Sequence, residues 1–169
     1  IALSGGKIEA KIEAKIEPQL IEEPKNSKER EHNIDIMAAP YKHESGGALT
    51  TQPERAWQAK SSKNEYHKFA VEHRMLMAAA YNGMKAEHLS DIKVKDGVII
   101  QGGGETYDAL LDGIKTELKS IKGANNLVRR ATKAVKLQGA SQILLEIEGI
   151  DEEVKKAIEV LRLKGIHGY

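Results

Sequence analysis

Apolar positions recur at helical spacing in three stretches of the chain. Between Lys63 and Asn82 apolar side chains return every three or four residues, and Asn82-Gly83 supplies a stop signal. The same spacing occurs over Asn125 to Gln138 and over Asp151 to Leu163. The pattern therefore predicts one amphipathic helix before the middle of the chain and two near its end.

Short apolar runs between these helices predict strands. Asp96-Gly97 and Asp112-Gly113 each separate two such runs, which is the two-residue signal of a β-hairpin. The predicted strands are Ala86 to Leu89, Ile92 to Lys95, Val98 to Gln101, Thr106 to Leu111, Ile114 to Ile121 and Ser141 to Ile147. The order α, β meander, α, β, α predicts an α/β domain with a mixed β-sheet flanked by helices.

The first residues follow a different pattern. Residues 7–17 read KIEAKIEAKIE, which places an isoleucine on one helical stripe every four residues. This repeat predicts a helix that ends at Pro18. A four-residue period drifts around a helix of 3.6 residues per turn, so it is not typical of a long coiled coil.

Residues 19–62 are polar and are interrupted by three prolines and by the triple Ser45-Gly46-Gly47. This composition predicts an extended linker with short docking pieces near Ile34 to Tyr41 and near Pro53 to Ala59. We therefore expect residues 1–60 to form an N-terminal linker or helical tether, partly disordered. The compact domain is expected to cover residues 61–169.

Composition removes several classes of function. The 169 residues are 40% hydrophobic but only 4% aromatic, so the core must consist of aliphatic side chains and a large β-sandwich is not expected. The absence of cysteine excludes thiolate metal sites, thiol nucleophiles and disulfides. No stretch approaches the roughly 18 apolar residues of a membrane span. A formal net charge of +1 selects no partner, and the missing initiator Met suggests a fragment of a longer protein.

The second hairpin places charged residues together. With Asp112 and Gly113 as the turn, Asp108 faces Glu117, and alternation puts Lys119 on the same face as Glu117. Facing carboxylates on neighbouring strands repel each other, and Mg²⁺ or Mn²⁺ would offset that repulsion. Lys119 could then activate a water or stabilise charge on phosphorus, which is the apparatus of phosphodiester hydrolysis. The alternative is a surface hairpin whose solvated acids are neutralised by the lysine.

The segment Tyr107 to Ser120, YDALLDGIKTELKS, resembles the core of the PD-(D/E)xK nuclease superfamily. It is most similar to the version found at the C-termini of bacterial polymorphic and contact-dependent-inhibition toxins. The resemblance extends over about Asn64 to Ile147, although Tyr107 stands where the name motif has Pro. It implies a restriction-endonuclease-like core with the order α-β-β-β-α-β.

The resemblance also implies roles for individual residues. Asp108 and Glu117 would bind the metal, and Lys119 would assist catalysis. Glu72 on the preceding helix is the best match to an additional catalytic and metal-binding acid, with Glu65 the second match. The expected cofactor is Mg²⁺ or Mn²⁺, with Zn²⁺ as a further possibility.

No acidic residue occurs between Glu117 and Glu146. Arg129, Lys133 and Lys136 share one helical stripe, which is typical of a surface that binds a phosphate backbone or of a solvated face. Gln138 resembles the glutamine that often closes the second core helix of the family. The expected substrate-binding residues are Lys122, Arg129, Arg130, Lys133, Lys136 and Gln138.

These features together predict a metal-dependent nuclease toxin, with tRNA favoured over DNA as its substrate. By resemblance it would be delivered from a larger secreted or phage-associated protein, act in the cytoplasm of a target cell and be blocked by a cognate immunity protein. One alternative is a non-catalytic module that binds nucleic acid or protein. Another is a metal-independent RNase using His73, Arg74 and His167, although His73 is more simply a core histidine and no spacing supports that set.

Overall fold

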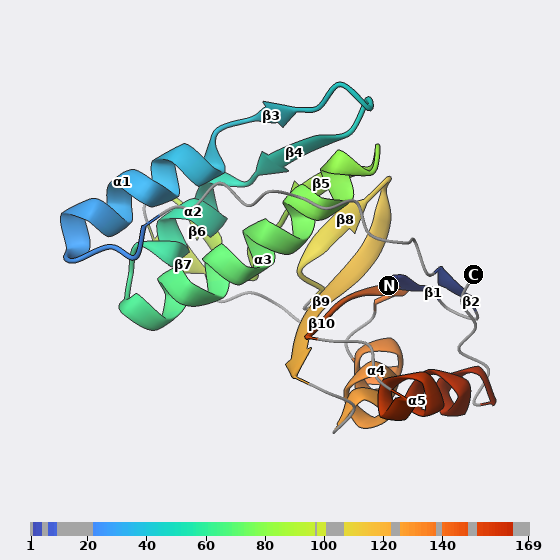
Figure 1. Ribbon diagram of the computed structural model, residues 1–169. Coiled ribbons are helices and arrows are strands. Elements are labelled where there is room, and N and C mark those ends of the chain that lie inside the picture. Colours follow the sequence, from blue (N-terminus) through green and yellow to red (C-terminus); the bar gives the residue numbers. More distant parts are fainter. Residues whose placement is uncertain are drawn as a thin grey trace. The chain divides into compact units, whose positions relative to one another are not determined.

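Figure 1 shows the computed structural model, which describes residues 2–4, 7–9, 22–96, 98–100, 107–122, 126–137, 140–148 and 152–163. The chain forms two compact units. Unit 1 consists of residues 1–13, 105–107 and 114–169, and unit 2 consists of residues 14–104 and 108–113. The predicted domain boundary at residue 61 falls inside unit 2.

Unit 2 contains a mixed sheet in the order β8-β5-β4-β3. Its strands are β3 (Tyr41–Lys42), β4 (Ala48–Thr51), β5 (Lys85–His88) and β8 (Ala109–Leu111). Strands β4 and β5 are parallel, while β3 and β8 are antiparallel to their neighbours. The expected meander is interrupted, because β6 (Lys93–Lys95) and β7 (Val98–Ile100) pair with each other in a separate two-stranded sheet.

The described residues of unit 2 form three helices, α1 (Ser27–Ala38), α2 (Pro53–Ala59) and α3 (Lys63–Tyr81). The prediction of α3 is confirmed. Ser62 caps it by accepting a hydrogen bond from the Glu65 amide at 3.1 Å, and Asn82 follows its last residue. The three helices share a core of buried side chains that includes Ile34, Met37, Ala59, Tyr66 and Phe69.

The structure differs from the expected linker over residues 27–59, which contain α1, β3, β4 and α2. Helix α1 buries only two apolar side chains, Ile34 and Met37, so its sequence lacks a strong amphipathic pattern. Its start is fixed locally, because Asn26 Oδ1 accepts a hydrogen bond from the Glu29 amide at 2.9 Å. Tertiary packing of a few residues stabilises these elements where local propensity is weak.

In unit 1 the strands β9 (Ile114–Lys122) and β10 (Gln142–Glu148) are parallel. β1 (Ala2–Ser4) is antiparallel to β10, and β2 (Lys7–Glu9) is antiparallel to β1. The predicted helix over residues 7–17 is therefore wrong at Lys7–Glu9, where strand pairing overrides helical propensity. The remainder of that helix lies outside the described residues.

Helices α4 (Leu127–Leu137) and α5 (Glu152–Leu163) complete unit 1 and confirm the two predicted C-terminal helices. Their buried apolar side chains pack with those of β9 and β10. This core consists of Ile121, Leu127, Ala131, Ile143, Leu145, Val154 and Leu161. Each unit thus combines a mixed sheet with packed helices, and the predicted α/β class is confirmed. The restriction-endonuclease-like core stays a prediction.

The turn at Asp112 and Gly113 is the predicted two-residue type. Both residues have positive φ, 49° and 78°, as a type I′ turn requires. Asp112 is also tied to β5, because its amide donates to the Lys85 carbonyl and its Oδ1 accepts from the Lys85 amide, each at 2.8 Å. Among the described residues, no helix has the length and apolar character needed to cross a membrane.

Candidate functional site

Glu117 and Lys119 form an ion pair on β9. Lys119 Nζ donates to Glu117 Oε1 at 2.6 Å, which confirms that the two side chains share a face of the strand. In the register with β10, Glu117 lies beside Ile143 and Lys119 beside Leu145. Because Ile143 and Leu145 pack against α4 and α5, the ion pair lies on the helix-covered face of the unit 1 sheet.

The opposite face of β9 fixes this register. Thr116 is fully buried there, and its Oγ1 accepts a hydrogen bond from Gln142 Nε2 at 2.7 Å. The same hydroxyl donates to the Ile114 carbonyl at 2.8 Å. A slip of one residue would break this pair and turn Glu117 away from the helices.

Among the described residues, only one of the two carboxylate oxygens of Glu117 has a hydrogen-bond partner. Its side chain is 3% exposed, whereas that of Lys119 is 26% exposed. Oε2 of Glu117 is buried and has no hydrogen-bond partner among the described residues. A buried carboxylate oxygen without a partner costs desolvation energy, so it is a position where a bound cation would stabilise the structure.

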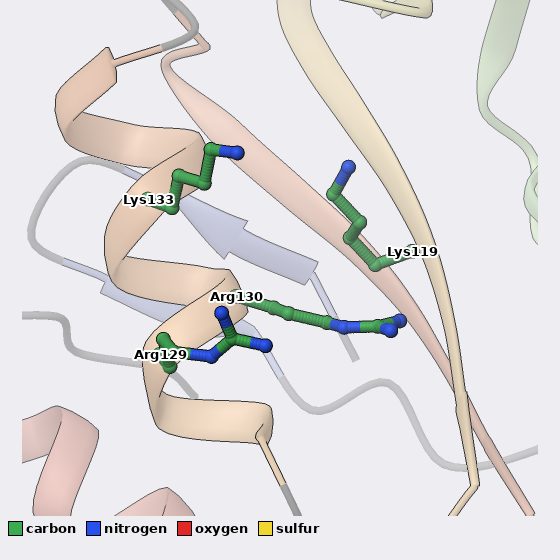
Figure 2. Close-up of a pocket in the computed structure, with 4 residues that line it drawn as sticks. All are labelled: Lys119, Arg129, Arg130 and Lys133. Atoms are coloured by element: carbon green, nitrogen blue, oxygen red, sulfur yellow. The ribbon is translucent and has the colours of Figure 1, made fainter.

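Next to this pair lies a hollow of about 180 Å³ that is lined by four cationic side chains, Lys119, Arg129, Arg130 and Lys133. We call it the cationic hollow. Figure 2 shows Arg130 and Lys133 extending from α4 toward the strand that carries Lys119. In the described part of the chain, no ion pair neutralises Arg129, Arg130 or Lys133. The hollow therefore attracts anions.

The two arginines occupy positions on α4 where their charge destabilises the helix but can bind an anion. Arg129 and Arg130 lie in the first turn of the helix, which carries no acidic residue. The positive end of the helix dipole lies there as well, so cationic side chains cost about 0.3–1 kcal/mol each at such a position unless an anion is bound. Arg129 reduces this cost only slightly through a 3.3 Å hydrogen bond from Nε to Asn126 Oδ1.

The remaining predicted substrate-binding residues lie elsewhere. Lys122 is exposed at the end of β9, and alternation places it on the face opposite Lys119. Lys136 belongs to α4, but its side chain is not among those described. Gln138 lies outside the described residues. The roles of these three residues in substrate binding stay predictions.

Asp108 directly precedes β8 and belongs to unit 2, whereas Glu117 belongs to unit 1. Within unit 2 its backbone is fixed, because the Asp108 carbonyl accepts a hydrogen bond from the Leu89 amide at 3.0 Å. Its side chain is half-buried. The predicted approach of Asp108 to Glu117 stays a prediction.

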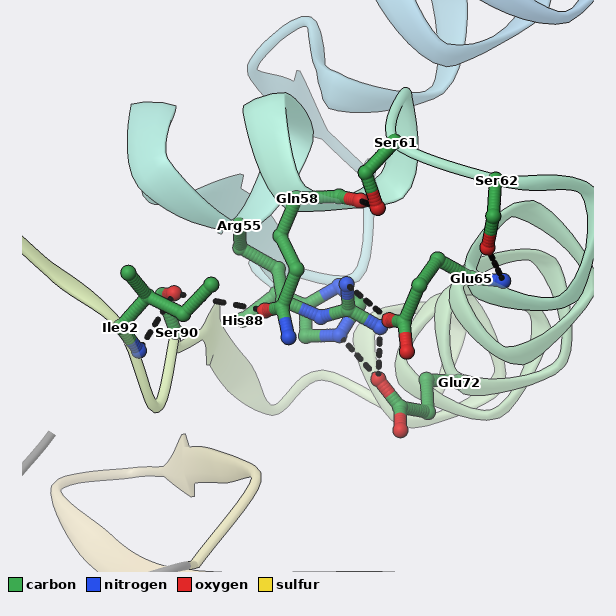
Figure 3. A network of polar contacts seen from close by, with 9 residues as sticks. All are labelled: Arg55, Gln58, Ser61, Ser62, Glu65, Glu72, His88, Ser90 and Ile92. Carbon is green, nitrogen blue, oxygen red and sulfur yellow. Dashed lines mark hydrogen bonds and ion pairs between the residues drawn. The ribbon is translucent and has the colours of Figure 1, made fainter. Parts of the chain in front are cut away.

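Glu72 lies in a buried network of charges in unit 2 (Figure 3). Its Oε2 accepts hydrogen bonds from Arg55 Nη2 at 2.8 Å and from His88 Nε2 at 2.7 Å. Burial alone would raise the pKa of Glu72, but the hydrogen bond from His88 and the charge of Arg55 outweigh it and lower this pKa to about 2. Glu72 is therefore ionised at neutral pH, with one oxygen already occupied. Its predicted role as a metal ligand stays a prediction.

Two histidines near this network are held neutral. Burial lowers the pKa of His88, although the Glu72 carboxylate opposes the effect, and Arg55 already supplies the charge that Glu72 needs. Burial also lowers the pKa of His73, to about 4. Phe69 stacks on both rings, with centroid distances of 5.1 Å to His88 and 6.0 Å to His73. The expectation of a core role for His73 fits this packing.

Sequence reasoning missed Arg55 and His88. Arg55 is 3% exposed and lies on α2, in the segment expected to be a linker, and Glu65 Oε2 lies 3.9 Å from its second amino group. His88 is fully buried on β5. A buried arginine requires an acidic partner, but the separation of 17 residues between Arg55 and Glu72 gave no local signal.

Among the described residues, no three histidine, aspartate or glutamate side chains gather into a metal-binding cluster. Mg²⁺ is usually held by only one or two carboxylates together with waters and substrate phosphate, so such a site needs no cluster of three. The unpartnered Oε2 of Glu117 fits a hard, oxygen-seeking cation, and we take Glu117 as the residue that would bind it.

Comparisons of the chain with protein-family models, with curated proteins and with solved structures give no match.

Proposed function

We propose that this chain is a metal-dependent nuclease that hydrolyses phosphodiester bonds. One observation carries the proposal: the buried carboxylate of Glu117 has one oxygen on Lys119 and the other without a partner, directly beside the cationic hollow. A buried carboxylate oxygen that could bind a cation, a partly exposed ammonium and a surface that attracts phosphate would each contribute to such hydrolysis.

In the proposed reaction, water adds to phosphorus and the ester bond between phosphorus and one sugar oxygen breaks. One product keeps the phosphate, and the other receives a proton on its released hydroxyl. A bound Mg²⁺ or Mn²⁺ supplies Lewis-acid charge and lowers the pKa of water. Lys119 places its ammonium where it can stabilise negative charge on the phosphoryl oxygens, and the cationic hollow holds a neighbouring phosphate.

Glu117 is the principal metal ligand in this proposal. The turn register read from the sequence predicts Asp108 as the second ligand. Glu72 is the third acidic residue suggested by the family resemblance. Its role would be indirect or would use its other oxygen, since Oε2 is held by Arg55 and His88.

The resemblance to toxin nucleases favours tRNA as the substrate, followed by DNA. The scarcity of aromatic residues, 4% of the chain, argues against broad stacking on single-stranded bases. The same resemblance makes a small immunity protein the expected inhibitor, and it makes a larger secreted or phage-associated protein the carrier into a target cell.

The test is incubation of the purified full chain with total RNA and with plasmid DNA, each in Mg²⁺, Mn²⁺ or Zn²⁺ and in EDTA. We expect cleavage of RNA that EDTA abolishes. Glu117→Gln and Lys119→Ala should each lower the rate by about 100-fold or more. The matched controls are Glu153→Gln and Lys156→Ala, two exposed residues of α5, which should cleave at the wild-type rate.

Full activity in EDTA, or wild-type rates for both site variants, would contradict the proposal. The cationic hollow itself supports one other function, a non-catalytic module that binds nucleic acid. That function would be indicated if RNA bound tightly, no cleavage occurred with any metal and Glu117→Gln left binding unchanged.

A further inference from the structure

We infer that Lys119 couples two binding sites, a divalent-cation site at Glu117 and a phosphodiester site in the cationic hollow, so that each ligand raises the affinity for the other. The inference rests on the proposed function, because it takes Glu117 as a cation ligand. It goes further by making substrate binding depend on the cation through one side chain of β9.

The Lys119 side chain contacts Glu117 and also lines the cationic hollow. Lys119 Nζ donates to Glu117 Oε1 at 2.6 Å, and the same side chain lines the hollow together with Arg129, Arg130 and Lys133. While Lys119 is paired with Glu117, much of its charge is neutralised by the carboxylate. The hollow then has the full attraction of only its three α4 residues.

The two partners differ in their freedom to move. The Glu117 side chain is 3% exposed on the helix-covered face of the sheet, whereas the Lys119 side chain is 26% exposed. A lysine has a flexible four-carbon stem and carries its charge at the tip, so its ammonium can change partner without a change in the backbone. Lys119 is therefore the member of the pair that can respond to a ligand.

A cation on the Glu117 carboxylate would compete with the ammonium for the same negative charge. Two positive charges at one carboxylate repel each other, which favours rotation of Lys119 toward the hollow. There the released ammonium would add a fourth unneutralised cation to Arg129, Arg130 and Lys133. A phosphate in the hollow would bind more tightly for that reason.

The ligand class follows from the donors. Arginine guanidinium groups bind phosphate oxygens through paired N–H donors, and lysine contributes a point charge. The described lining residues of the hollow include no carboxylate and no large apolar side chain. A phosphodiester group of a polynucleotide satisfies these donors better than an apolar or cationic ligand would.

Coupling of this kind is reciprocal. If the cation raises phosphate affinity by some factor, phosphate must raise cation affinity by the same factor. Couplings between two sites in proteins typically amount to about 5–150-fold. We expect a value near the lower end, because the hollow is open to solvent and water screens part of the interaction.

The experiment uses the full chain, Ca²⁺ as the cation and a short fluorescein-labelled oligonucleotide with a nuclease-resistant 2′-O-methyl phosphorothioate backbone. Anisotropy titrations give the oligonucleotide affinity with and without Ca²⁺, and calorimetry gives the Ca²⁺ affinity with and without the oligonucleotide. No step depends on cleavage. We expect both affinities of the wild-type protein to rise by the same factor, about 5-fold or more.

Two variants and one control separate the explanations. Lys119→Met should bind Ca²⁺ and the oligonucleotide, but neither ligand should raise the affinity for the other. The variant lacks the ammonium that moves from Glu117 to the hollow. Glu117→Gln should bind the oligonucleotide without Ca²⁺ as tightly as the Ca²⁺-saturated wild type and should not respond to Ca²⁺. Lys156→Met, which changes an exposed lysine of α5, should keep the wild-type gain.

The outcomes are distinct. If wild-type protein binds both ligands with no gain, or if Lys119→Met keeps the full gain, the coupling is wrong while the proposed nuclease function stands. If no Ca²⁺ binding depends on Glu117, the metal site and the coupling both fail. If the oligonucleotide does not bind at all, the hollow is a solvated surface and the coupling is again wrong.

Discussion

The ammonium of Lys119 lies 2.6 Å from Oε1 of Glu117, while the second oxygen of that carboxylate is buried with no partner among the described residues. The lysine of this pair is thus partly exposed to solvent, whereas the glutamate is buried. In a purely structural salt bridge, hydrogen bonds normally satisfy both carboxylate oxygens. An unpartnered buried oxygen there would only destabilise the fold. It suits a site that receives a further ligand.

The first prediction concerns the stability of this pair. Lys119→Met leaves the Glu117 carboxylate buried without a counter-charge, and we expect a loss of about 1–3 kcal/mol in the free energy of unfolding. This is less than the 3–5 kcal/mol of a fully buried pair, because Lys119 is partly exposed. Urea unfolding of the metal-free protein measures it. The double variant with Glu117→Gln should recover most of the loss, and additive effects of the two changes would contradict the interpretation.

The second prediction concerns salt dependence. Arg130→Ala and Lys133→Ala should each weaken oligonucleotide binding and lower the slope of log K against log salt by about 1. Lys155→Ala is the control, because Lys155 is paired with Glu152 on α5 at 2.7 Å, outside the lining of the hollow. Anisotropy titrations over a range of KCl concentrations give the slopes. Equal slopes for all three variants and the wild type would exclude the hollow as the phosphate contact.

The third prediction concerns Glu72, whose folded pKa of about 2 lies below its ordinary value of 4.5. A carboxylate with a depressed pKa stabilises the fold above pH 4.5, and this contribution of about 3 kcal/mol is lost as pH falls from 4.5 toward 2. The hydrogen bond from His88 and the charge of Arg55 both hold this pKa down, and Arg55→Met removes the second of them, so the pKa of Glu72 should rise. An NMR titration of the Glu72 carboxyl carbon measures both values. An unchanged pKa in Arg55→Met would show that Arg55 does not control this carboxylate.

The fourth prediction separates His73 from Glu72 by pH. Burial lowers the pKa of His73 from 6.5 to about 4, so the folded state favours the neutral ring. The unfolded chain binds the proton first, and stability therefore falls by about 2–3 kcal/mol as pH drops from 6.5 to 4. His73→Phe should flatten the stability curve in that window and leave the decline below pH 4.5 intact. Denaturant midpoints measured between pH 7 and pH 3 test this, and an unaltered slope above pH 4.5 would contradict it.

The fifth prediction concerns Gly47, which is buried against the end of α3. A Cβ at this position would lie 1.7 Å from the backbone oxygen of Ala80, so Gly47→Ala must displace backbone atoms. We expect a loss of about 3 kcal/mol or more in unfolding free energy. Gly46→Ala is the matched control, because its Cβ would meet open space and only its φ of +88° is strained, at a cost of about 1 kcal/mol. Similar losses for both variants would show that Gly47 tolerates a side chain.

Much of the fold could be predicted from local patterns. Helix α3 followed from its apolar spacing and its Ser62 and Asn82 caps, and the turn at Asp112 followed from the Asp-Gly pair. The shared face of Glu117 and Lys119 followed from strand alternation. These features depend on a few neighbouring residues, so a single sequence is enough to reveal them.

Other features depend on residues far apart in the chain. Helix α1 is stabilised by two buried side chains, Ile34 and Met37, whose packing partners lie on other helices. Hydrogen bonds from Arg55 and His88 to Glu72 connect α2, α3 and β5. The pairing of β5 with β8 replaces the expected meander. No periodicity within one segment encodes such contacts, and this is why the expected linker was wrong over residues 27–59.

The Glu117–Lys119 pair and the residues that line the cationic hollow come from one short stretch of chain. Glu117, Lys119, Arg129, Arg130 and Lys133 all fall within residues 117–133, on one strand and the helix that follows it. Only a brief connection has to close before these charges meet, so the entropy lost in gathering them is small. During refolding, the Glu117–Lys119 pair and the cationic hollow should therefore form early, before the pairings between residues far apart in the chain.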